Sequence, residues 1–160
     1  MWKEPKFSAT ADDVQFAALL QEIGALVTSQ IAKEKEMTSA LQYALSQSED
    51  RIGVEESMFG MSSASVAAIV FSEWKFSQDI VDYIGGSDHP ETAPEYAVMG
   101  AKALKIAKVL ASLGKPKKPN LPDEAVETAR ALVLEYGFSE AKFDEMVERV
   151  NKELDRNSDA

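Results

Sequence analysis

Residues 62–86, SSASVAAIVFSEWKFSQDIVDYIGG, carry ten large apolar side chains in this 160-residue chain. These side chains recur at helical spacing around most of the circumference, as in a helix buried on several sides. They are Val66, Ile69, Val70, Phe71, Trp74, Phe76, Ile80, Val81, Tyr83 and Ile84. Ser62 or Ser63 can cap its start, and Gly85 and Gly86 can end it. The segment predicts one central helix over residues 62–84.

The chain before this segment predicts a second long helix, over residues 10–48. Thr10 is a suitable N-cap, and no proline or late glycine interrupts the chain between Ala25 and Ile52. One face carries large apolar residues, which we expect to point to the core. They are Phe16, Leu19, Leu20, Ile23, Leu26, Val27 and Ile31. Residues 49–61 contain two glycines and are interpreted as a connection.

An unbroken helix of this length would be about 58 Å long, well beyond its neighbours, at a rise of about 1.5 Å per residue. Its far end would expose an apolar stripe of Met37, Leu41 and Leu45, which something must cover. The C-terminal helices could cover it, or a second chain could do so in a homo-oligomer. A third possibility is that KEKE at 33–36 breaks the helix and its halves fold back.

After residue 86 the pattern predicts a third helix starting near Ala93 and a C-terminal hairpin. The third helix has a narrow side of small residues, along which another helix could approach closely: Gly100, Ala103, Ala107 and Ala111. The sequence therefore predicts an all-α helical bundle of three longer helices plus a C-terminal helical hairpin. The expected parts are an arm (1–9), the bundle core (10–113), a Lys/Pro-rich linker (114–121) and a hairpin packed on the bundle (122–156).

Composition limits the classes of function. The net charge is −10 and the chain has no cysteine, which excludes thiolate catalysis, Cys-ligated zinc and disulfides. No apolar run approaches the length of about 20 residues that spans a bilayer. We therefore expect a soluble protein. The composition leaves the compartment open, with the cytoplasm slightly favoured over the periplasm.

A lysine-rich segment stands out against this acidic background. Residues 99–118 hold six lysines and no acidic residue: Lys102, Lys105, Lys108, Lys115, Lys117 and Lys118. These lysines can balance acidic helices within the molecule, or they can bind an anion or an acidic partner. No arginine and no interleaved aromatic residue accompanies them, which argues against nucleic acid.

Few side chains in this sequence are placed for catalysis or metal binding. His89 is the only histidine, and Asp79, Asp82 and Asp88 are the carboxylates that a carboxylate-based enzyme could use with it. Their spacing fits no metal-binding or nucleophile motif. We therefore predict no catalytic residue, no metal site and no cofactor.

The leading hypothesis is a non-enzymatic helical interaction or assembly protein that binds itself or another protein through the seam of Met37, Leu41 and Leu45. The alternative is a carrier or sensor of a small apolar ligand in a pocket formed by Phe71, Trp74 and Met99, although packing in the core also explains these side chains. A carboxylate-based enzyme is the second alternative.

Overall fold

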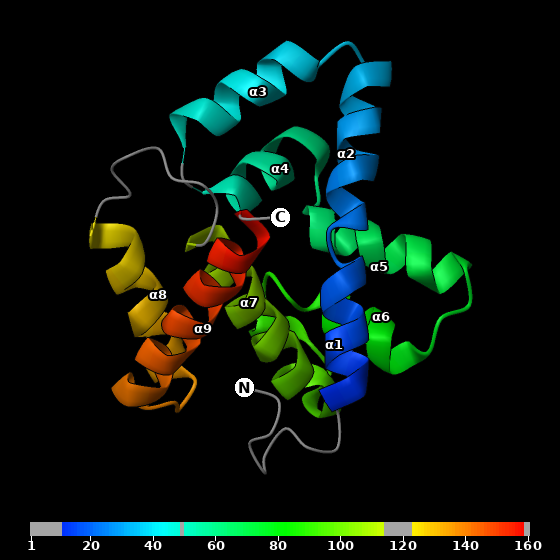
Figure 1. Ribbon diagram of the computed structural model, residues 1–160. Coiled ribbons are helices and arrows are strands. Elements are labelled where there is room, and N and C mark those ends of the chain that lie inside the picture. Colours follow the sequence, from blue (N-terminus) through cyan, green and yellow to red (C-terminus); the bar gives the residue numbers. More distant parts are fainter. Residues whose placement is uncertain (1–10, 49, 114–122, 159–160) are drawn as a thin grey trace. The chain divides into compact units, whose positions relative to one another are not determined.

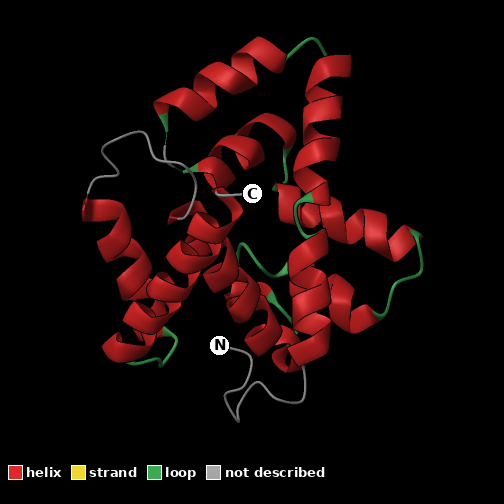
Figure 2. Cartoon of the chain, in the orientation of Figure 1, coloured by secondary structure: helices red, strands yellow, loops and turns green. Residues whose placement is uncertain are grey.

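The computed structural model describes residues 11–48, 50–113 and 123–158, and every regular element within these ranges is helical (Figure 2). This confirms the all-α class. The chain divides into two compact units, with the boundary between Leu104 and Lys105. None of the helices that the structure describes is long and apolar enough to cross a membrane.

In the part of the first unit that the structure describes, there are six α-helices and the start of a seventh, labelled in Figure 1. They are α1 (Ala11–Leu20), α2 (Ile23–Glu34), α3 (Thr38–Gln47), α4 (Arg51–Phe59), α5 (Ser63–Glu73), α6 (Gln78–Gly85) and α7 (Val98–Leu113). Two short 3-10 turns, η2 (Pro90–Thr92) and η3 (Glu95–Ala97), precede α7. Helix α1 packs beside α6, α2 crosses α5, and α3 lies next to α2 and α4.

Both of the predicted long helices are broken. The break within residues 62–84 corrects the expected continuity, whereas the break between Glu34 and Thr38 agrees with the alternative of a break at KEKE. Residues 11–47 contain three helices, α1 to α3, and residues 63–85 contain α5 and α6. Glu36 and Lys75 adopt the left-handed conformation, with φ of 57° and 62°. The next N–H in each case bonds back five residues, from Met37 to the Ala32 carbonyl and from Phe76 to the Phe71 carbonyl. This closure ends a helix by satisfying its last carbonyls.

The predicted connection at 49–61 is also corrected, because most of it is helix α4. Asp50 caps this helix by accepting a hydrogen bond from the Gly53 N–H at 2.9 Å, and Gly60 ends it with φ of 80°. The third helix likewise starts later than expected, at Val98 instead of Ala93, because the 3-10 turn of Glu95–Ala97 comes first.

Small residues bring α2 and α5 into close contact. A side chain on Gly24 would place its Cβ 1.8 Å from the Ser63 carbonyl oxygen and 3.1 Å from the Ala67 Cβ. Thr28, one turn further along α2, is buried, and its hydroxyl lies 3.4 Å from that of Ser63. Gly100 at the start of α7 similarly faces the buried ring of Tyr83. The sequence placed Gly100 on the narrow side of this helix, where a close approach was expected.

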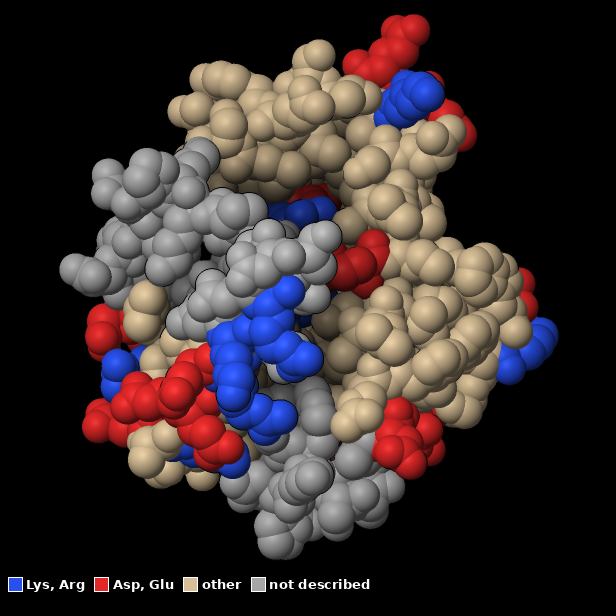
Figure 3. Space-filling model, viewed as in Figure 1, with Lys and Arg blue, Asp and Glu red and all other residues tan. Residues whose placement is uncertain are grey.

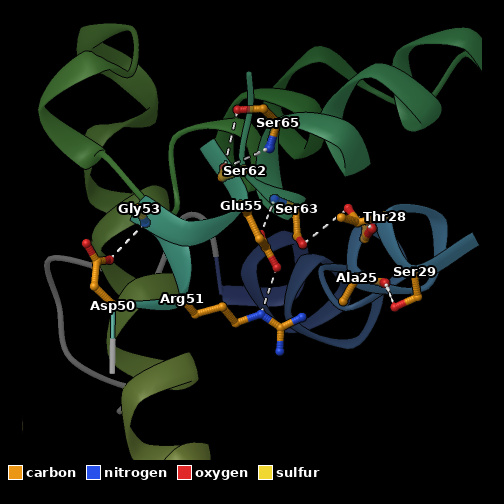
Figure 4. Close-up of polar contacts among 11 residues, drawn as sticks. Ala25, Thr28, Ser29, Asp50, Arg51, Gly53, Glu55, Ser62, Ser63 and Ser65 are labelled. Carbon is orange, nitrogen blue, oxygen red and sulfur yellow. Dashed lines mark hydrogen bonds and ion pairs between the residues drawn. The ribbon is translucent and has the colours of Figure 1, made fainter. Parts of the chain in front are cut away.

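A buried carboxylate joins α4 to the start of α5 (Figure 4). Glu55 is 3% exposed; its Oε1 accepts from the Arg51 Nε at 2.8 Å and its Oε2 from the Ser63 N–H at 2.7 Å. Ser62 caps the same helix by accepting from the Ser65 N–H. Two side chains therefore satisfy N–H groups that the first turn of α5 leaves without helical partners.

Replacing Gln21 with methionine should stabilise the protein. Gln21 is 7% exposed, and its Oε1 is buried without a hydrogen bond among the described residues. Because such an atom costs about 1–3 kcal/mol, Gln21→Met should raise the free energy of unfolding by about 1 kcal/mol in urea denaturation. Gln15→Met, at an exposed position of α1, should change it little. A loss of stability in Gln21→Met alone would show that the amide is satisfied after all.

The second unit holds the remainder of α7 and the predicted hairpin of α8 (Asp123–Glu135) and α9 (Glu140–Ser158). Helices α8 and α9 pack through buried residues, and the Arg130 guanidinium lies 5.0 Å from the centre of the Phe143 ring. The buried residues are Ala129, Val133, Phe138, Phe143 and Met146. The docking of this hairpin on the bundle stays a prediction. The arm and the linker lie outside the described residues. Thr10, the first residue of the expected bundle core, lies outside them as well.

Candidate functional site

The outer side of α1 and α2 exposes large apolar side chains. Leu19 is 81% exposed, Leu26 is 70% exposed and Phe16 is 44% exposed. With the partly buried Ile23 they follow a spacing of three, four and three residues, which places them on one side of the two helices. We call these four residues the outer face. The expectation that this set points to the core is wrong for Phe16, Leu19 and Leu26.

Smaller residues occupy the inner side instead. Val14, Ala17, Gln21, Gly24, Thr28 and Ala32 are all buried. Both sets follow helical spacing, so periodicity alone cannot decide which set is buried, and the larger apolar side chains are the usual choice for a core. The available signal was Gly24, since a glycine inside a helix often marks a close packing contact.

An aromatic cluster continues the outer face at its α1 end. The ring of Phe16 stacks on Phe76, with centroids 6.1 Å apart, and Phe76 packs on Phe71 at 4.9 Å. Phe71 in turn meets Trp74 edge-on at 5.7 Å. Phe71 is fully buried, whereas Trp74 is 59% exposed at the end of α5. The cluster therefore anchors Phe16 on one side and presents Trp74 to solvent on the other.

The helices around this surface carry few charges. Glu22 is the single charged residue between Asp13 and Lys33, and residues 57–72 have none. The space-filling view agrees, because the side of α1, α2 and α5 turned to the viewer is mostly tan, with an acidic group within it and further charged groups at its margins (Figure 3). A surface with large exposed apolar groups and few charges is typical of protein interaction sites.

Comparison with known proteins places this surface inside a recognised domain. The model of the HDOD domain family matches residues 2–90, more than half of the chain. The chain belongs to the HDOD domain family. The match includes the outer face and the buried Glu55 with its partners Arg51 and Ser63, and it ends before α7. Helices α7 to α9 thus lie outside the matched HDOD region.

A solved structure has a similar fold. The crystal structure of a virulence factor from Campylobacter jejuni subsp. jejuni aligns with a TM-score of 0.60 and 19% identity. The alignment covers 86% of this chain and 52% of that one, so the chain spans about half the length of its structural neighbour. At this identity the likeness supports the helical fold of the HDOD chain alone. The curated protein sequences include no significant match.

The predicted seam lies on α3 of the HDOD chain. Leu41 is buried at 8% exposure, and Met37 and Leu45 are partly buried. Because the helix break turns α3 back beside α2 and α4, the chain itself covers much of the stripe that an unbroken helix would have exposed. The role of the seam as an interface stays a prediction. The outer face is far more accessible to a partner protein than the seam is.

The lysine segment is only partly described. Lys102, Lys105 and Lys108 lie on α7 at three-residue spacing, and each is partly buried and engaged with other groups. Lys115, Lys117 and Lys118 fall outside the described residues. The segment follows the HDOD match, and its binding of an anion or acidic partner stays a prediction.

The predicted ligand pocket is divided between elements. Phe71 and Trp74 pack together at the end of α5, whereas Met99 is a partly buried residue in the first turn of α7. The full burial of Phe71 agrees with its alternative interpretation as core, while the exposure of Trp74 does not. Binding of an apolar ligand here stays a prediction.

The candidate carboxylates do not form one cluster with His89. The His89 ring lies between two other acids, with Nε2 2.9 Å from Glu56 Oε1 and Nδ1 3.4 Å from Glu91 Oε1. Asp82 instead accepts hydrogen bonds from the Tyr96 hydroxyl and from Gln78. Within the described ranges, no group of three or more such side chains is arranged to hold a metal ion. The enzyme alternative stays a prediction.

The Tyr96 and Asp82 pair predicts a loss of stability at alkaline pH. The hydrogen bond to Asp82 raises the pKa of Tyr96 from about 10 to about 12. The folded state holds this proton more tightly than the unfolded state. The contribution of the hydrogen bond to the free energy of unfolding is therefore complete below pH 10 and is lost as pH rises toward 12. The free energy of unfolding of the wild type should therefore fall across this window, more steeply than that of Tyr96→Phe.

Tyr43→Phe is the matched control for this pair, because Tyr43 is an exposed tyrosine on α3. It should keep the alkaline loss of the wild type. A tyrosinate absorbance titration should also lose its highest transition in Tyr96→Phe alone. Equal alkaline slopes in all three proteins would show that the hydrogen bond does not persist in solution.

Proposed function

We propose that this HDOD domain is a non-enzymatic interaction domain that binds another protein through the outer face. The observation that supports this most is that α1 and α2 bury their small side chains and expose large apolar ones, opposite to the usual arrangement. Large side chains, Leu19 and Leu26, face solvent while small ones are buried. Single exposed leucines are ordinary in folded proteins, but here they share one side of adjoining helices with Phe16 and Ile23.

The surroundings of the outer face favour binding over a purely structural role. Phe16 is held by its stack on Phe76, and α2 is held against α5 at Gly24. A rigid surface loses little conformational entropy when a partner binds, so more of the energy of apolar burial remains as affinity. The proposal gives no catalytic role to any residue, and it replaces the seam on α3 with a more exposed surface.

The test compares partners that co-purify with three forms of the chain from its native cells. The double variant Leu19→Asp, Leu26→Asp should lose a partner that the wild type retains. Leu134→Asp, which changes an exposed leucine of α8, should retain it. Circular dichroism would show that all three are folded. A set of partners that is unchanged by the double variant would contradict the proposal.

A further inference from the structure

The shape of the outer face suits a partner helix. Its four side chains lie within residues 16–26, which span about 15 Å at a rise of about 1.5 Å per residue. They form an apolar ridge along α1 and α2, and such a ridge packs best into the groove between side chains of another helix. The described ranges contain no strand, so they offer no sheet edge to which an extended peptide could add.

The charges near the outer face are mainly acidic. Asp12 and Asp13 are exposed in the first turn of α1, and the exposed Glu22 lies where α1 meets α2. Lys3 and Lys6 precede α1 and lie outside the described residues, and the next basic residue, Lys33, comes two turns after Leu26. Beside the aromatic cluster, the opposite charges of Glu73 and Lys75 offset each other. A complementary partner therefore carries basic residues beside its apolar ones.

We propose that the occupant of the outer face is an amphipathic helix of a partner protein, with an apolar ridge flanked by Lys or Arg. This inference rests on the proposed function and adds the chemistry of the partner. A second copy of the chain fits less well, because Glu22 lies near the middle of the face and would meet its own copy across a two-fold axis. An anionic lipid surface is disfavoured by the net charge of −10.

Two synthetic helices would test this partner chemistry. Both carry leucines at the same helical spacing; one has lysine and the other glutamate at the flanking positions. Each is titrated into the isotope-labelled full chain while amide NMR shifts are followed. We expect the lysine helix to shift amides of α1 and α2 and to bind at least about tenfold more tightly than the glutamate helix.

The Leu19→Asp variant separates apolar recognition from simple charge attraction. It adds a negative charge, so a purely electrostatic contact with the lysine helix would become tighter. We expect its affinity to fall by about tenfold or more, because the leucine contributes apolar burial to the contact. Leu134→Asp adds the same charge to α8 and should leave the shifts in α1 and α2 unchanged.

The outcomes separate this inference from the proposed function. Equal binding of both helices to the outer face would overturn the basic partner but leave an interaction surface. A dimer of the wild type that Leu19→Asp dissociates would also overturn it, with a second copy as the occupant. Tighter binding by Leu19→Asp would reduce the contact to charge attraction and overturn it as well. A monomer whose outer face responds to neither helix would overturn the inference and remove support for the proposed function.

Discussion

Replacing Gly24 with alanine is expected to lower the free energy of unfolding by about 2–3 kcal/mol, as overpacking of a tight contact does. The new Cβ would lie 1.8 Å from the Ser63 carbonyl oxygen, a backbone atom that cannot rotate away. The start of α5 is also held by Glu55 and by the Ser62 cap. Helix α2 must therefore move, and the gain of about 1 kcal/mol in helix propensity from alanine offsets only part of the loss.

Gly85→Ala is the matched control for this contact. Its nearest neighbour would be a single side-chain atom, the Ala68 Cβ at 3.1 Å, which requires a shift of only a few tenths of an ångström. We expect the free energy of unfolding to change by less than about 1 kcal/mol. If urea denaturation gave the same small change for Gly24→Ala, the close approach of α2 to α5 would be wrong.

Replacing Glu55 with alanine is expected to lower the free energy of unfolding by about 3 kcal/mol, because a buried acceptor of two hydrogen bonds is lost. The Ser63 N–H would lose its partner, and so would Arg51. We place the effect at the lower end of the range for buried ion pairs because Arg51 is 52% exposed and water can solvate it. Thermal or urea unfolding would measure the loss.

Two further variants identify which part of Glu55 matters. Glu55→Gln keeps an oxygen that can accept from the Ser63 N–H, so it should cost only about 1 kcal/mol. Glu56→Ala removes the neighbouring acid, which is 42% exposed and pairs with His89, and should cost less than about 1 kcal/mol. A Glu55→Ala variant as stable as Glu56→Ala would contradict the buried link between α4 and α5.

The helical class and the C-terminal hairpin were predictable because helix formers and caps agree along most of the chain. Ser62 indeed caps α5. The break at Glu36 falls in the KEKE segment, where a break was one of three possibilities that the sequence did not decide between. The break at Lys75 was not predicted, because lysine favours helices. Their left-handed conformation depends on how the segments pack, whereas the usual sequence signal for such a helix end is glycine. The helices were therefore predicted too long.

The candidate site was harder to predict for a related reason. Helices α1 and α2 carry one set of large apolar residues and another of small residues, both at helical spacing. Which set is buried depends on how close the neighbouring backbone comes, and the contact of Gly24 with Ser63 requires small residues on the inner side. A pattern within one helix does not contain that distance. The exposed position of Leu19 followed only from the tertiary structure.

The most direct measurement of the central claim is site-specific photocrosslinking in the native cells. A photoreactive amino acid would replace Leu19 on the outer face in one form of the chain and Leu134 on α8 in another. The account predicts a discrete crosslinked protein from position 19 that is absent from position 134. Crosslinking from position 134 alone, or the same products from both positions, would contradict the assignment of the outer face as the contact surface.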